Sequence, residues 1–244
     1  MNWTAPLDFY CERTDAGFWA EPFNALSNAS FLIAAAILLS SLARENFRDR
    51  PATLLAAWIG VIGIGSFLFH TFANRWSLFA DVVPIQVFIL GYFFLAMRRF
   101  LGLNLVFAGV LTAGFFFLAG RLPSLLPFGL RGPGGYLAGL GALVVVGFLV
   151  LARSRRAPSR PGITGDVAWR TGLGLLGAAA LFAVSLAFRT VDMQVCDVVP
   201  TGTHPLWHIL NGAVLFWLVE IARRAAAPSP PGSGPRPGAA QEGE

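Results

Sequence analysis

Seven apolar stretches, each long enough to cross a lipid bilayer as an α-helix, are the feature of this 244-residue sequence that most restricts its fold. A hydrocarbon core of ~30 Å requires about 20 apolar helical residues. Hydrophobic residues make up 55% of the chain and charged residues only 13%, which is more apolar than a soluble domain of this length requires. We therefore expect an all-α integral membrane protein whose seven-helix bundle forms one domain over residues 24–222. The expected helices cover residues 24–42, 53–72, 77–97, 101–120, 134–152, 171–188 and 203–222.

The two ends of the chain differ from the bundle in composition. Residues 1–23 carry mixed charges and lack a basic start followed by an apolar run, so we expect an exported N-terminal segment rather than a cleaved signal peptide. From residue 223 the chain is rich in Pro, Gly and Ser, a composition that buries too little apolar surface to order itself. Residues 223–244 are expected to form a disordered cytoplasmic tail.

The basic residues, all 18 of them arginine, indicate how the bundle lies in the membrane. Most follow the first, third, fifth and seventh expected helices, and the positive-inside rule then predicts an N-terminus outside and a C-terminus in the cytoplasm. Arginines that face anionic lipid account for the net charge of +5 and argue against a nucleic-acid partner. The five on the opposite side are Arg13, Arg75, Arg121, Arg131 and Arg189.

Three histidines, the full complement of this chain, fall at the ends of apolar segments. His204 and His208 stand four residues apart, which places both rings on one face of a helix. The predicted topology brings His70, at the end of the second helix, to the same external membrane face. Three imidazoles with a fourth position open to water are typical of catalytic zinc. The alternative is that each histidine only bonds a neighbouring backbone carbonyl.

A hydroxyl and a carboxylate accompany the histidines. Ser66 precedes His70 by four residues, and Asp81 lies early in the third helix, where an acidic side chain needs a partner. Zinc lowers the pKa of water and polarises a carbonyl, a carboxylate can move the proton, and a hydroxyl can stabilise an oxyanion. These residues predict hydrolysis of an amide or ester in a membrane lipid, although Ser66 could equally serve as a small residue at a helix contact.

The external segments hold two further candidate features. Cys11 and Cys196 both fall on the predicted outer side, where a disulfide is permitted; two free thiols are the alternative. Acidic and amide side chains cluster in the N-terminal segment, and oxygen ligands of this kind suit calcium, with a solvated acidic tail equally possible. The cluster comprises Asp8, Glu12, Asp15, Glu21, Asn24 and Asn28.

Taken together, these motifs resemble the alkaline ceramidases, seven-helix membrane hydrolases of a superfamily that also includes the adiponectin receptors. The resemblance covers residues 8–220. It rests on Cys11-Glu12, on the run Glu21-Pro22-Phe23-Asn24-Ala25-Leu26-Ser27-Asn28, on Ser66-x-x-x-His70 with Asp81, and on His204-Pro205-Leu206-Trp207-His208. The order of the motifs is closer to the ceramidases than to the receptors, which have the opposite orientation.

The resemblance implies a specific site and reaction. Zinc would be held by the three histidines, with Ser66 and Asp81 completing an active site that cleaves the N-acyl bond of ceramide into a sphingoid base and a fatty acid. It also implies a disulfide between Cys11 and Cys196, and calcium binding through Glu12 and Glu21 with Asp8 nearby. Asp8 stands one place further from the cysteine than the family pattern has it, and the segment between the two glutamates is shorter.

The sequence is compatible with more than one substrate and more than one class of function. An arginine-only, Gly- and Ala-rich composition is typical of GC-rich bacterial genomes, so we expect a bacterial inner membrane, a site near its periplasmic face, and ceramide or another N-acylated lipid as substrate. A lipid ester hydrolase, a receptor or sensor with a structural zinc, and an electron-transfer protein with haem on two histidines are the rivals. The sequence indicates no oligomeric state.

Overall fold

A computed structural model describes residues 2–125, 134–155 and 162–226. The described residues form helices and connecting segments, with no β-strand among them. The elements are α1 (Pro22–Ser27), α2 (Ala29–Arg44), α3 (Arg50–Phe72), α4 (Arg75–Arg99), α5 (Leu105–Leu125), α6 (Gly134–Arg153), α7 (Gly165–Val191), the 3-10 turn η2 (Asp192–Gln194) and α8 (His204–Ala226).

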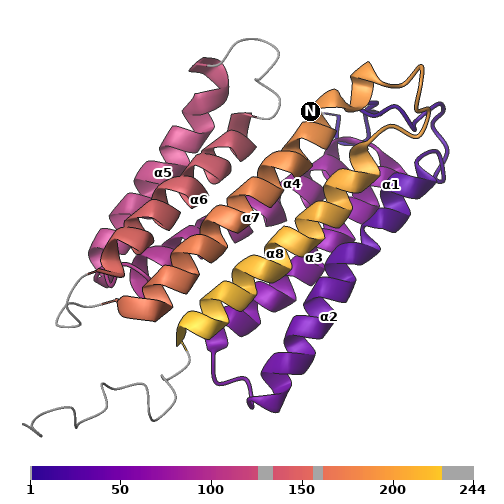
Figure 1. The fold of residues 1–244 in the computed structure, drawn as a ribbon. Helices are drawn as coiled ribbons and strands as arrows, with labels where there is room; N and C mark the ends of the chain where they lie inside the picture. Colours follow the sequence, from indigo (N-terminus) through magenta and orange to yellow (C-terminus); the bar gives the residue numbers. More distant parts are fainter. Residues whose placement is uncertain (1, 126–133, 156–161, 227–244) are drawn as a thin grey trace, which may run out of the picture.

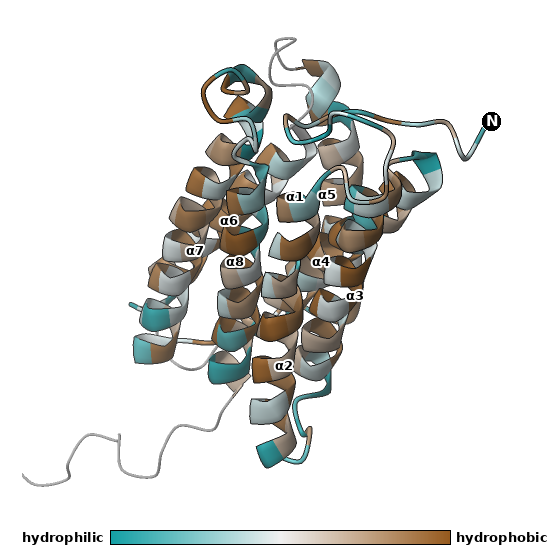
Figure 2. Ribbon diagram, turned by 90° about the vertical axis from the view of Figure 1, so that its right-hand side faces the viewer, coloured by the Kyte–Doolittle hydropathy of each residue, from teal (hydrophilic) through white to brown (hydrophobic). Residues whose placement is uncertain are grey.

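Seven spans of the described chain are long and apolar enough to cross a membrane, which confirms the predicted helical membrane fold. The short α1 runs on into α2 to make the first span, and η2 extends α7. Apolar residues dominate the middle of the helices and hydrophilic residues gather at their ends (Figure 2). The orientation in the membrane stays a prediction from the arginines.

Most helix ends lie beyond the expected ones because caps and polar ends extend the helices past the apolar stretch. The clearest exception is the start of α5, at Leu105 rather than 101, because Gly102 has a positive φ of 67° and the Asn104 side chain caps the first turn. α3 begins at Arg50, three residues early, since the Asp49 side chain accepts a hydrogen bond from the Ala52 N–H at 3.2 Å and so satisfies a free donor of the first turn. α8 continues to Ala226, past the expected boundary at 222/223. The rest of the predicted tail, 227–244, lies outside the described residues.

The helices lie side by side, with α2 at one edge of the bundle and the α5 and α6 pair at the other (Figure 1). α8 packs against α2, α3 and α7, while α4 packs against α3. A continuous apolar core runs between them, and its fully buried members include Leu42, Ile59, Phe100, Leu175 and Val219. Because the connections between helices are short, chain-adjacent helices run antiparallel, and the ends of α3 and α7 meet the starts of α4 and α8.

We call this end of the bundle the histidine end, because it carries His70, His204 and His208. The N-terminal segment is fixed across it at two places. Leu7 donates its N–H to the carbonyl oxygen of Ala73, at the turn between α3 and α4, at 2.8 Å. A disulfide joins Cys11 to Cys196, in the connection between α7 and α8, which confirms the predicted pairing. The segment therefore covers the helix ends.

Candidate metal centre

Three buried histidines meet at the histidine end, as the sequence predicted. His70 comes from the last turns of α3, and His204 and His208 come from the first two turns of α8. Each is only 1–2% exposed. One potential ligand nitrogen from each lies within 4.8 Å of the other two, and no other group of three His, Cys, Asp or Glu side chains in the described residues is arranged to hold a metal. The cluster could bind a metal ion.

Hydrogen bonds outside the cluster orient two of the rings. The Glu21 carboxylate lies 2.6 Å from His70 Nδ1, and an ionised carboxylate can only accept, so Nδ1 carries the proton. The Ser27 hydroxyl donates to the Asn24 carbonyl and therefore accepts from His208 Nδ1, 2.7 Å away. Both histidines then present the lone pair of Nε2, as metal-ligating histidines with an oriented second nitrogen do.

The donor set passes a direct test of whether it suits a metal. His70 Nε2 is buried and has no hydrogen-bond partner among the described residues, and the same holds for His204 Nδ1. Buried polar atoms without partners are rare in native proteins because they cost the full penalty of desolvation. A cation held by these nitrogens would remove that penalty, so the residues fit a metal ion.

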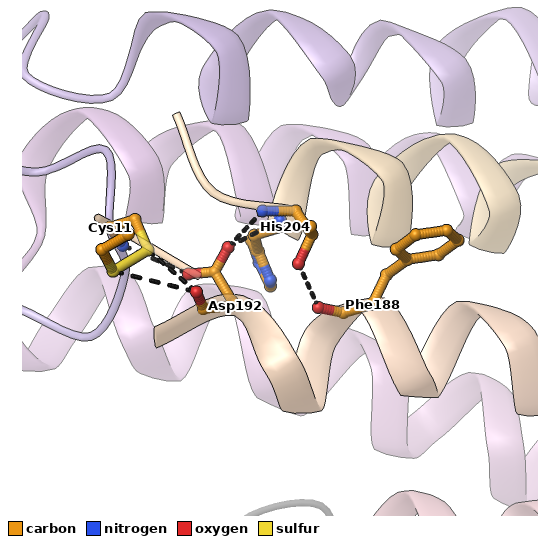
Figure 3. Close-up of a disulfide and its surroundings, with 6 residues drawn as sticks. Cys11, Phe188, Asp192 and His204 are labelled. Atoms are coloured by element: carbon orange, nitrogen blue, oxygen red, sulfur yellow. Dashed lines mark hydrogen bonds between the residues drawn. A yellow bond between two sulfur atoms is a disulfide. The ribbon is translucent and has the colours of Figure 1, made fainter. Parts of the chain in front are cut away.

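Asp192 positions His204 from the end of α7. Its carboxylate accepts hydrogen bonds from the N–H groups of Thr203 at 2.6 Å and His204 at 2.8 Å, and so satisfies, from another element, donors at the start of α8 that have no partner within the helix. The same side chain accepts from the Cys11 N–H at 3.2 Å. Figure 3 shows Asp192 between the disulfide and His204. One buried carboxylate thus connects the N-terminal segment to a candidate ligand.

Tyr10 covers one face of the His204 ring. The two rings stack with centroids 3.8 Å apart, and Tyr10 is 7% exposed. Burial raises the pKa of the Tyr10 phenol well above its ordinary value, so this ring stays neutral. The N-terminal segment therefore covers this side of the histidine cluster with an uncharged aromatic ring.

Ser66 and Asp81 lie beside the histidines in the cavity described next. They come from the facing helices α3 and α4, are 3% and 9% exposed, and their side chains interact. Asp81 Oδ1 is buried without a hydrogen-bond partner in the described part of the chain. The structure thus brings together the five side chains that the sequence analysis assigned to one site.

An apolar cavity extends from this site into the bundle. Its lining includes Ser66, Asp81, His204 and His208 at one end and side chains of α4, α6 and α7 along its walls. On α8 the lining runs from His204 to Leu218, fourteen residues apart, or about 21 Å at the helical rise per residue. That length exceeds half of a ~30 Å hydrocarbon core, so one acyl chain of a single leaflet would fit along it.

The acidic residues predicted to bind calcium are not brought together as ligands. Glu12 accepts hydrogen bonds from the N–H groups of Phe23 and Asn24, at 2.6 and 2.8 Å, and burial raises its pKa. Glu21 is engaged by His70, as described above, and Asp8 is exposed. Two of the carboxylates therefore already have partners from the protein, whereas Asn24 Oδ1 and Asn28 Oδ1 of the same cluster are buried without a hydrogen-bond partner among the described residues. Calcium binding by this segment stays a prediction.

Arg13 lies in the N-terminal segment among the residues that were predicted to bind calcium. Its guanidinium forms an ion pair with Glu21 and donates to the carbonyl oxygens of Asp15 and His70, at 3.1 and 3.2 Å. Burial alone would raise the pKa of Glu21, but the hydrogen bonds from His70 and Arg13 outweigh it and lower the pKa below its ordinary value. A cation of the protein itself thus pairs with Glu21, one of the residues that the sequence predicted as a calcium ligand.

Comparison with known proteins adds no family. Neither protein-family models nor curated proteins match this sequence. The chemistry of the site therefore carries the functional inference.

Sequence reasoning missed four residues that shape the site. Ser27 stands in the run quoted above, but nothing in its spacing points to a histidine in α8. Asp192 and Tyr10 belong to connecting segments, whose contacts have no periodic signal. Arg189 was counted only as an external arginine, although a charge in an otherwise apolar helix is itself a signal of function.

Proposed function

We propose that this protein is a zinc-dependent intramembrane hydrolase that cleaves the amide bond of ceramide or a related N-acylated lipid, releasing a free amine and a fatty acid. The observation that carries the proposal is the buried three-histidine cluster at the head of an apolar cavity that also contains Ser66 and Asp81. The resemblance of the motifs to those of the alkaline ceramidases supports it.

Zinc is the metal that best suits this donor set. Three imidazole nitrogens without a cysteine or a bidentate carboxylate are the ligands of catalytic zinc sites, which keep a position for water or substrate. The carboxylate and hydroxyl that orient His70 and His208 are the outer partners such ligands require. When bound, zinc supplies a Lewis acid and lowers the pKa of water toward ~7.

Asp81 is the group that moves the proton. Asp81 lines the cavity together with His204 and His208 and has a buried oxygen without a hydrogen-bond partner in the described part of the chain, so it can accept a proton from the attacking water. The oxygen of that water forms the new bond to the acyl carbon. As the carbon–nitrogen bond breaks, Asp81 returns the proton to the nitrogen, and the amine leaves neutral.

Ser66 and the cavity walls complete the site. The Ser66 hydroxyl can donate a hydrogen bond to the carbonyl oxygen as negative charge develops on it, a contribution of the kind made by oxyanion holes. The apolar lining along α4, α6, α7 and α8 holds the acyl chain and excludes water. A lipid would enter from the membrane, with the site at the periplasmic face that the arginine distribution predicts.

The test uses detergent-purified full-length protein with its metal content measured by mass spectrometry. We expect about one zinc per chain and release of fatty acid from ceramide or another N-acyl lipid, abolished by a zinc chelator and restored by zinc. Asp81→Asn should retain zinc but lose about 100- to 10,000-fold in kcat, the range for general acid–base groups.

His208→Ala provides the deciding measurement. If this variant kept both stoichiometric zinc and full hydrolysis, the proposal would be wrong. A wild-type protein that binds zinc in a closed four-ligand sphere and cleaves no acyl lipid would favour a receptor or sensor instead.

A further inference from the structure

Arg189 is a charged residue of the cavity that the proposed reaction does not use. It lies in the last turn of α7 and lines the same cavity as Asp81 and His204. Its guanidinium carbon lies over two aromatic rings, 5.3 Å from the centre of Tyr136 and 5.6 Å from that of Trp207. The cation is therefore held in place at the head of the cavity, close to the site where the amide would react.

No carboxylate forms an ion pair with the guanidinium of Arg189 in the described part of the chain, and Asp81 and Asp192 act on its charge only from beyond ion-pair distance. None of the hydrogen bonds or ion pairs formed there includes it, and its Nε is buried without a partner. Aromatic rings contact a guanidinium through its flat face, which leaves the N–H donors in its plane available. Those donors form a fork that matches a carboxylate or phosphate.

Other buried or half-buried arginines of this chain show the contrast. Arg13 pairs with Glu21, Arg99 with Asp49 and Arg223 with Glu220. A charged group inside an apolar environment is costly unless it is paired. Arg189 forms no such ion pair with the described residues, at a position where a substrate would lie, so an anion in direct contact with it is expected to arrive with the substrate.

We propose that Arg189 binds an anionic group on the amine part of the substrate, so that the preferred substrate is an N-acylated lipid with a carboxylate or phosphate near its amide bond. This inference rests on the proposed hydrolase function and narrows its substrate class. Ceramide offers only neutral hydroxyl groups on that side of the amide. A lipid N-acyl amino acid offers a carboxylate, and an N-acyl phosphatidylethanolamine offers a phosphate.

The experiment compares three substrates that share one acyl chain: ceramide, N-acylglycine and N-acyl phosphatidylethanolamine. We expect a higher kcat/KM for one of the two anionic lipids than for ceramide, and which one it is identifies the anion. In Arg189→Met, the ratio of kcat/KM for that lipid over ceramide should fall by about 10- to 100-fold, the range for a lost hydrogen bond to a charged group. Arg189→Lys should restore part of the ratio because it keeps the charge.

The matched control is Arg75→Met, which removes an exposed arginine at the start of α4, at the same end of the bundle. Its substrate ratio should equal that of the wild type. A wild-type preference for ceramide, or an equal loss of ratio in Arg75→Met and Arg189→Met, would overturn the inference, since Arg189 would then serve the fold through its aromatic contacts alone.

A binding measurement separates this inference from the proposed reaction. N-Acylglycine is titrated into chelator-treated protein, with tryptophan fluorescence as the readout. If N-acylglycine binds about tenfold or more weakly to Arg189→Met than to the wild type, the anion site is supported even if no lipid is hydrolysed. If instead ceramide is hydrolysed and the affinity for N-acylglycine is unchanged in the variant, the anion site is refuted and the hydrolase function stays intact.

Discussion

Glu21 contacts His70 from outside the donor cluster and fixes which nitrogen of that ring carries the proton. Loss of such an outer partner typically weakens metal binding by about 10- to 100-fold. We therefore expect Glu21→Gln to reduce zinc affinity by this factor, measured by competition with a chromophoric chelator. Asp8→Asn, which neutralises an exposed carboxylate in the same segment, is the control and should bind zinc like the wild type. Equal affinities for both variants would show that Glu21 does not orient His70.

Arg13 leads to a prediction about calcium. Its guanidinium pairs with the buried Glu21 and with no other carboxylate of the described residues, while it donates to carbonyl oxygens of the N-terminal segment, so Glu21 already has a cation from the protein as its partner. Adding calcium, or removing it with a calcium-selective chelator, should leave the melting temperature unchanged. Arg13→Ala should lower the free energy of unfolding by about 3–5 kcal/mol, because a buried charge is left alone.

The control for Arg13 is Arg75→Ala, which removes an exposed arginine and is expected to change stability by less than about 0.5 kcal/mol. A wild-type protein whose melting temperature rises with calcium would contradict the assignment of Arg13 as the cation of this segment.

The contrast between the histidines and Glu21 shows what residue-level prediction can reach. The small number of histidines in the chain and the four-residue spacing of two of them identified His70, His204 and His208, because a polar ligand in an apolar helix differs clearly from its neighbours. Glu21 was also singled out, but as a candidate calcium ligand, and its contacts with His70 and Arg13 were not predicted. The sequence does not show that Arg13 folds back onto it, since that contact depends on the path of an irregular segment.

At the scale of elements, α3 and α4 approach each other closely where Gly65 faces Ala80. A Cβ added to Gly65 would overlap the Ala80 carbonyl oxygen. Pro84 lacks the N–H that would otherwise bond this carbonyl within α4, so the oxygen is free to face the neighbouring helix. The close approach brings Ser66 and Asp81, the next residue of each helix, into one site.

Gly65→Ala should therefore separate the two helices. We expect a loss of about 1–3 kcal/mol in stability, typical of overpacking, and a fall in lipid hydrolysis as Ser66 and Asp81 move apart. Thermal unfolding and the hydrolysis assay measure the two effects. Gly109→Ala in α5, where an added Cβ meets nothing within 4 Å, should leave both unchanged; hydrolysis at wild-type level in Gly65→Ala would rule out this role of the close approach.

The helices themselves were predictable because hydropathy alone identifies a segment that can cross a bilayer. Their ends were less so. The early start of α3 depends on a cap from Asp49, and the late end of α8 includes Arg223 and Arg224, whose long side chains can reach the membrane surface. The meeting of α3 and α8 at one end followed from the predicted topology, whereas the tilt that brings the rings within ligand distance did not.

At the scale of the whole molecule, the disulfide between Cys11 and Cys196 closes a loop of most of the chain, with a sequence separation of 185 residues. It also holds the segment that carries Tyr10, Glu12 and Glu21 over the histidines. A disulfide of this kind persists on the oxidising side of a membrane, and the arginine distribution independently assigns the same end to the outside. The two arguments rest on different residues but predict the same orientation, so an experiment that determines the orientation tests both.

Cysteine labelling in intact cells provides that experiment. After reduction, a membrane-impermeant maleimide should label Cys11 and Cys196, because the arginine distribution predicts that both lie on the outer side. Arg48→Cys, placed at the opposite end of the bundle in a background with both native cysteines changed to serine, should remain unlabelled until the cells are opened. Labelling of Arg48→Cys in intact cells would reverse the orientation and place the metal centre at the cytoplasmic face, where a reducing environment would break the bond that holds the N-terminal segment over the histidines.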